Sequence, residues 1–182
     1  MDVNPDTTFE IEPAAASAMS GITRMVVPTD ERDDALAHTR EAALSFARTF
    51  GFDVVLYDRS DERWTDTPHA SGPFTAAEID AEHRPHLPRQ LRDFEAAGVR
   101  ATAWLATVPA LTAMLDVLQE LQVDGVLLPD SLDHPKMMDR IQIGADPASM
   151  VDRVAELQMP TPPTVFVVPT TGPTTITTYK ET

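Results

Sequence analysis

Hydrophobic residues along the chain form two kinds of pattern, short apolar runs and longer stripes at helical spacing. The first run, 22–27, ends at Pro28, which lacks an N–H group and cannot continue a ladder. In the next segment, 33–50, apolar residues recur three and four positions apart, and Gly51 supplies the left-handed residue that commonly ends a helix. The pattern predicts a strand followed by a helix.

This unit repeats along the chain. Apolar runs predict further strands at 52–57, 99–105, 123–128 and 164–168, and apolar stripes predict helices between them, at 87–94, 109–121 and 147–157. Strands that read as apolar runs and alternate with amphipathic helices are typical of a parallel sheet covered on both faces. The sequence therefore predicts an α/β domain with a five-stranded, mostly parallel sheet and helices on both faces.

Three segments fall outside the repeat, which leaves 21–169 as the expected domain. Residues 1–20 contain two prolines and an Ala/Ser run with little apolar pattern, so we expect an N-terminal tail outside the core. Residues 60–85 are too long for an ordinary connection and are expected to be a surface insertion or a functional flap. Residues 170–182 are rich in threonine and are expected to form a C-terminal tail or an edge strand.

Composition narrows the class of protein. Hydrophobic residues make up 42% of the chain and charged residues 24%, close to the average of soluble proteins. A net charge of −15 argues against binding to nucleic acid or to an anionic membrane. The chain has no cysteine, no apolar run of membrane-spanning length and no signal-peptide pattern at its acidic N-terminus. We therefore expect a cytoplasmic protein without disulfides.

Aspartates stand at the ends of three predicted strands. In an open parallel sheet, ligands bind beyond the carboxyl ends of the strands, and Asp30, Asp58 and Asp130 fall there. Carboxylates gathered at one edge could bind Mg²⁺, so a Mg²⁺-dependent phosphate-handling enzyme is one hypothesis. Aspartates also stabilise turns and cap helices, and we favour that role for Asp58 and Asp130.

Other catalytic and metal-binding patterns are absent from the sequence. It contains no Walker loop, no Gly-x-Gly-x-x-Gly and no Gly-x-Ser-x-Gly. A phosphoacceptor receiver would need an aspartate after the third strand and a lysine after the fifth, where this chain has Thr107 and Thr170. His83 and His86 are separated by Pro85 and have no third ligand nearby, so we expect exposed loop histidines and no metal site.

The stretch VVPTDERDDALAHTREAALSFARTFGFDVVLYD resembles the opening of a universal stress protein domain. That family begins with a strand ending in valine-proline-x-aspartate, followed by an amphipathic helix and a second strand. The resemblance continues through AAGVRATAWL and LQVDGVLLP to PPTVFVVP and covers about residues 22–169. It implies the Rossmann-like universal stress protein fold.

Nucleotide-binding members of that family carry Gly-x2-Gly-x9-Gly-[Ser/Thr] after the fourth strand, and its backbone holds the phosphates of ATP. Aligned from the strand, Pro129 and Leu132 replace the first two glycines of this loop. Aligned from Gly144, they are replaced by Ser131 and His134. Side chains with a Cβ atom crowd an anion, and Pro129 cannot donate an N–H. The resemblance thus implies that ATP binding is lost or weakened.

The resemblance also places Asp30 where family members contact adenosine, beside Pro28 and Thr29. Asp30 is equally suited to cap the helix that begins near Asp33. The candidate residues for a nucleotide or another small ligand are Pro28, Thr29, Asp30, Asp130 and Gly144. No catalytic residue and no metal ligand is assigned, no cofactor is expected, and ATP or another adenine nucleotide is disfavoured.

Together these patterns predict a universal-stress-like binding or regulatory protein without catalytic turnover. The Mg²⁺-dependent enzyme that uses Asp30, Asp58 and Asp130 is one alternative. Another is a structural subunit whose tails and insertion bind protein partners. Because universal stress domains commonly pair through their fifth strand, we expect a homodimer through 164–168 and the C-terminal tail.

Overall fold

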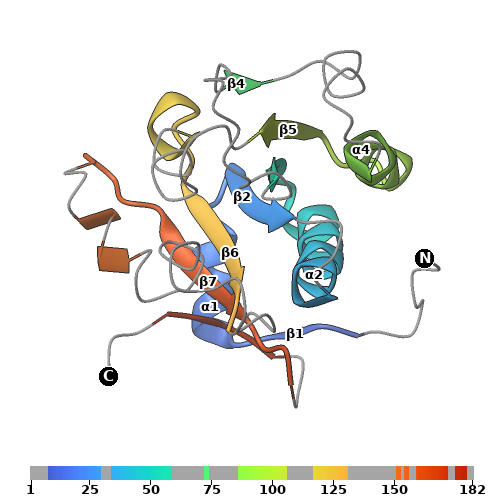
Figure 1. Cartoon of the computed structure of the whole chain (residues 1–182). Helices are drawn as coiled ribbons and strands as arrows, with labels where there is room; N and C mark the ends of the chain where they lie inside the picture. Colours follow the sequence, from blue (N-terminus) through green and yellow to red (C-terminus); the bar gives the residue numbers. More distant parts are fainter. Residues whose placement is uncertain are drawn as a thin grey trace, which may run out of the picture.

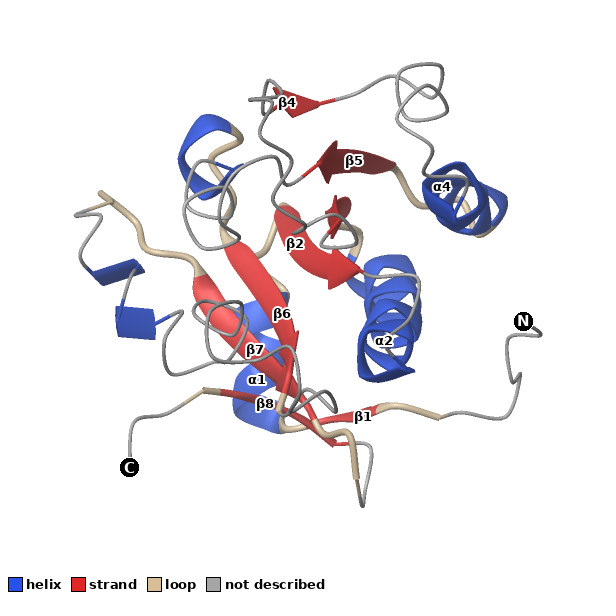
Figure 2. Ribbon diagram, viewed as in Figure 1, coloured by secondary structure: helices blue, strands red, loops and turns tan. Residues whose placement is uncertain are grey.

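The computed structural model describes residues 8–29, 34–58, 72–73, 86–105, 117–130, 151–152, 154–155, 159–171 and 175–179. Figures 1 and 2 show the arrangement of these elements. The longer elements are β2 (Arg24–Thr29), α2 (Asp34–Phe50), β3 (Asp53–Asp58), α4 (His86–Ala96), β5 (Ala101–Leu105), β6 (Gly125–Pro129) and β7 (Thr164–Val168). The shorter ones are β1 (Glu10–Ile11), α1 (Pro13–Met19), β4 (Gly72–Pro73) and β8 (Thr175–Thr178).

The strands form one sheet in the order β1-β8-β7-β6-β2-β3-β5-β4. The five strands from β7 to β5 run parallel to their neighbours and correspond to the five predicted strands. The predicted α/β class with a mostly parallel sheet is therefore confirmed. β4 and β8 pair antiparallel with β5 and β7, and β1 pairs parallel with β8. At two residues each, β1 and β4 are too short to leave a periodic signal in the sequence.

Alternating side chains of the strands build a core on each face of the sheet. On one face, residues such as Val27 and Leu56 pack in a cluster with α1, α2 and α4. On the other, Val26, Tyr57 and Trp104 pack with the described helical residues of 117–120 and 151–155. Figure 2 shows helices on both sides of the sheet, as predicted. In the part of the chain that the structure describes, no helix is long and apolar enough to cross a membrane.

Within residues 8–20, α1 packs into the core, so the expectation of a tail outside it is wrong for this segment. Ala15 and Met19 of α1 are fully buried and share a cluster with Phe166 and Ile176. α1 is buried because α2 and α4 leave part of this face of the sheet uncovered. α2 and α4 contact β2, β3, β5 and β6, whereas α1 contacts β8. The N-terminal helix thus buries apolar surface near the β8 side of the sheet.

The remaining features are the ends of two helices, the C-terminal strand and the predicted insertion. Gly51 and Gly98 have φ values of +82° and +76° and follow α2 and α4, so Gly51 ends α2 as predicted and Gly98 ends α4 in the same way. The C-terminal segment forms a strand, one of the two expectations for it, but β1 lies at the edge beyond it. Most of the predicted insertion, 60–85, lies outside the described residues.

Candidate functional site

The carboxyl ends of the parallel strands meet at one edge of the sheet. β2 pairs with β3 along its whole length, and β6 pairs with β7 likewise. β2 pairs with β6 only at Met25 and Val26, so these two strands separate toward their carboxyl ends (Figure 1). The chain order reverses between them, and sheets of this kind bind ligands at such a reversal. The candidate site is therefore this edge of the sheet, with the carboxyl ends of β2 and β3 on one side of the separation and those of β6 and β7 on the other.

At the ends of β2 and β3, polar side chains are buried against α4. Asp58 is 0% exposed and His86 is 3% exposed, and His86 Nε2 lies 3.2 Å from Asp58 Oδ1. Asp58 is the last residue of β3 and His86 the first of α4, so this contact joins the two ends of the 59–85 segment. A ligand in solvent cannot reach either group while α4 stays in place.

Thr29, at the end of β2, is also bonded within the protein. Its hydroxyl donates to Gln90 Oε1 at 3.0 Å and accepts from Arg40 Nη1 at 2.9 Å. Thr29 and Gln90 are buried. Burial lowers the pKa of the Arg40 guanidinium from its ordinary value, and the negative charge of Asp93 opposes this shift. An arginine remains protonated in such a site, so the single O–H hydrogen of Thr29 is directed to Gln90.

At the ends of β6 and β7, an exposed aspartate connects the two strands. Pro129 is buried and pairs with Val168. The Asp130 N–H donates to the Val168 carbonyl at 2.9 Å. Asp130 Oδ1 in turn accepts hydrogen bonds from the Thr170 N–H at 2.9 Å and from its hydroxyl at 2.6 Å. These contacts connect the end of β6 to the segment that follows β7, 40 positions away in the sequence.

The structure describes three of the five candidate ligand residues. Pro28 and Thr29 are buried in β2, and Asp130 is exposed at the end of β6. Asp30 and Gly144 lie outside the described residues. The structure therefore brings Thr29 together with Gln90 of α4, and it leaves Asp130 on the other side of the strand separation.

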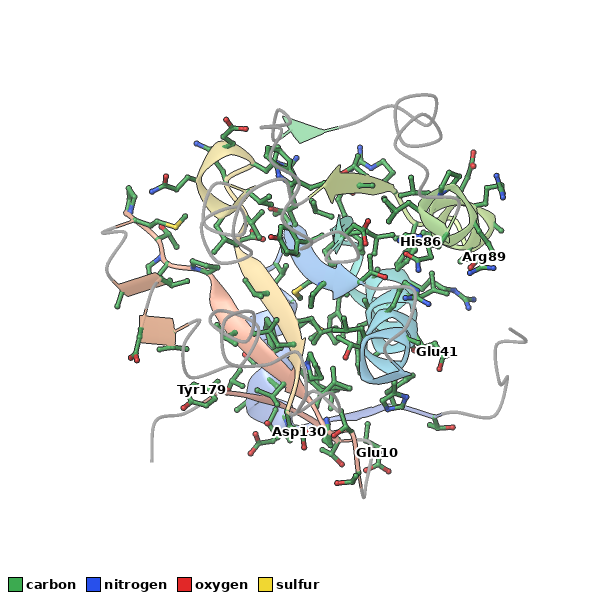
Figure 3. All side chains as sticks on the ribbon, in the orientation of Figure 1. Glu10, Glu41, His86, Arg89, Asp130 and Tyr179 are labelled. Atoms are coloured by element: carbon green, nitrogen blue, oxygen red, sulfur yellow. The ribbon has the colours of Figure 1, made fainter. Side chains whose placement is uncertain are left out.

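The carboxylates proposed for Mg²⁺ lie on separate strands. β2 stands between β3 and β6, so Asp58 and Asp130 are two strands apart, about 10 Å at the usual strand spacing. Figure 3 shows His86, the partner of Asp58, well apart from Asp130. Among the described residues, no group of three or more histidine or acidic side chains could hold a metal ion. Asp30 lies outside this set, and the Mg²⁺ hypothesis gains no support from the other two carboxylates.

Sequence reasoning missed three residues of this edge. His86 was expected to be exposed in a loop, which is wrong, because it begins α4 and is buried. Arg40 and Gln90 were not singled out at all. One signal was present, since His86, Gln90 and the buried Phe94 are four residues apart and share one face of a helix. The hydrogen bond from Arg40 has no comparable local signal.

Two solved structures share this architecture. Universal stress protein UspA from Lactobacillus plantarum matches with a TM-score of 0.52 and 17% identity, over 80% of this chain and 97% of that one. The hypothetical protein MJ0577 matches with a TM-score of 0.51 and 12% identity, over 83% of this chain and 98% of that one. No family model and no curated protein matches the chain.

At these identities the likeness is one of fold. The protein is thus an α/β protein of the Rossmann-like class, with its chain reversal between β2 and β6. More particularly, it has the universal stress protein fold, and the resemblance noted in the sequence is confirmed at that level.

Proposed function

We propose that this is a universal-stress-like binding or regulatory protein, without catalytic turnover, in which ATP binding is lost or weakened. Fold alone does not determine function, so the proposal depends on the residues at the candidate site. The observation that carries it is the hydrogen bonding at the start of the loop after β6.

A loop that holds phosphates must present several free backbone N–H groups to the anion. Pro129, the last residue of β6, has no N–H, and the N–H of Asp130 is donated to the Val168 carbonyl. The carboxylate of Asp130 is exposed and held in place by Thr170. An incoming phosphate would meet a negative charge where it needs donors, and like charges at close range repel.

The β2 side of the site supports the same proposal. The hydroxyl hydrogen of Thr29 is donated to Gln90, and both side chains are buried. A nucleoside at this position would have to displace Gln90 or rely on other atoms. The exposed carboxylate of Asp130 favours a ligand that carries hydrogen-bond donors or positive charge over one that carries phosphates.

The ionisable groups at this edge support a role without turnover. His86 and Asp58 form the kind of imidazole–carboxylate pair that general-base catalysis often uses. Both are buried against each other at the base of α4, so the pair contributes to the attachment of that helix. A general base must lie within hydrogen-bonding reach of its substrate, and these two groups are not open to one.

Isothermal titration calorimetry with ATP tests the proposal. We expect the full-length protein to bind ATP with a Kd weaker than about 1 mM. Asp130→Asn keeps an acceptor for Thr170 but removes the charge, so it should bind ATP more tightly than the wild type. Glu95→Gln, which removes an exposed charge on α4, is the matched control and should not change the affinity. Micromolar or tighter binding by the wild type would contradict the proposal.

A further inference from the structure

The homodimer surface expected from the sequence, strand five with the following tail, is occupied within one chain. β8 pairs antiparallel with β7, and its partners are Phe166 with Thr178 and Val167 with Thr177. The Tyr179 N–H also donates to the Val165 carbonyl. The free edge of the sheet has therefore moved from β7 to the outer side of β8.

β1 covers that outer side. Glu10 pairs with Thr175 and Ile11 with Ile176, in parallel orientation. The Glu12 N–H donates to the Ile176 carbonyl at 3.0 Å. The Thr175 hydroxyl also donates to Glu10 Oε2 at 3.4 Å. The first half of β8, Thr175 and Ile176, is thus paired on its outer side with the N-terminal segment of the same chain (Figure 2).

Ile11 of β1 packs against the core, and further contacts hold the chain on either side of β1. On the N-terminal side, the ring of Phe9 lies 5.0 Å from that of His38 and 6.2 Å from that of Phe46, both on α2. On the C-terminal side, α1 is fixed in the core by the buried side chains of Ala15 and Met19. The ladder itself involves two residues of β1. Because its hydrogen bonds are few, β1 can detach while α1 stays in place.

We propose that β1 and a second copy of this chain compete for the outer edge of β8. The strand Thr175–Thr178 has β-branched side chains only and no charge, so nothing in it opposes pairing with another strand. Antiparallel pairing of β8 with the β8 of a second copy is self-complementary about a two-fold axis. While β1 is paired with β8, a second copy cannot pair there, and no dimer forms through this edge. This inference does not depend on the proposed function.

A pair of N-terminal truncations tests the competition. Deletion of residues 1–11 removes Phe9 and β1 but keeps α1, whereas deletion of residues 1–7 keeps all three. In analytical ultracentrifugation over a wide concentration range, the full-length chain and the shorter deletion should be monomeric. The longer deletion should form a concentration-dependent dimer with an unchanged helical circular dichroism signal. The competition is refuted if the full-length chain dimerises as strongly as the longer deletion, or if the latter is folded and monomeric.

A third variant shows whether such a dimer uses the β8 edge. The main-chain N–H groups of successive strand residues point toward opposite neighbouring strands. Because the Tyr179 N–H points toward β7, the N–H of Thr178 points away from β7, toward the outer edge. Proline at an outward N–H is tolerated in an edge strand. Adding Thr178→Pro to the longer deletion should abolish the dimer and preserve the fold. A dimer that survives this substitution would overturn the assignment of the edge.

A point substitution covers the case in which the longer deletion does not fold. Glu12 has φ −61° and ψ 140°, values that proline adopts without strain, and the extended conformation expected for Ile11 suits a residue before proline. Glu12→Pro therefore removes the hydrogen bond to Ile176 and changes little else. It should self-associate more strongly than the control Glu12→Gln, which keeps the N–H. Equal self-association of the two variants would refute the role of β1 as a cover.

Discussion

Two aspartates at the same edge of the sheet, Asp58 and Asp130, have opposite surroundings. Each ends or directly follows a parallel strand, yet Asp58 is fully buried beside His86 and Asp130 is exposed and bonded to Thr170. The difference arises from the element that each carboxylate contacts. Asp58 lies against α4, and Asp130 follows β6 and bonds Thr170, which follows β7. An aspartate at a strand end is therefore not by itself a sign of a ligand site.

The largest effect is expected from Asp58→Ala. It leaves the buried His86 ring without this carboxylate, and removing one partner of a buried hydrogen bond costs up to about 3 kcal/mol of unfolding free energy. Urea denaturation followed by circular dichroism measures the loss. If the variant were as stable as the wild type, the pair would not attach α4 to the sheet.

A smaller loss is expected from Thr29→Val. This substitution keeps the shape of the side chain but removes the hydroxyl that bonds Gln90 and Arg40. Leaving buried polar groups without a partner costs about 1–3 kcal/mol. Thr102→Val, at an exposed position on β5, is the matched control and should change stability by less than about 0.5 kcal/mol. Equal losses in the two variants would show that the Thr29 contacts add nothing to stability.

The smallest effect is expected from Asp130→Ala. Its hydrogen bonds to Thr170 are exposed to water, so their loss should cost less than about 1 kcal/mol. The same urea titration serves for this variant. A loss of unfolding free energy as large as that of Asp58→Ala would show that the two aspartates contribute equally to stability, despite their different surroundings.

The fold was largely predictable because its signals are local. Apolar runs marked the five parallel strands, and Gly51 marked the end of α2. α1 was missed because its alanines and serine leave no apolar period, and its burial depends on uncovered surface near β8, far away in the sequence. Propensity and pattern do not report such distant packing.

At the candidate site, the sequence could predict only those properties that a residue has in any conformation. Pro129 lacks an N–H in any conformation, so the absence of this donor at the start of the loop could be derived from the sequence alone. The use of the Asp130 N–H by Val168 depends on the pairing of two distant strands. The burial of His86 likewise depends on where α4 lies against β3. Neither could be derived from local pattern.

Hydrogen exchange at the amide of Asp130, measured by NMR with and without ATP, tests the central claim most directly. This N–H is bonded to the Val168 carbonyl. We expect the Asp130 amide to be protected from exchange in the free protein and its exchange rate to be unchanged by ATP. Fast exchange in the free protein that slows when ATP is added would contradict this claim.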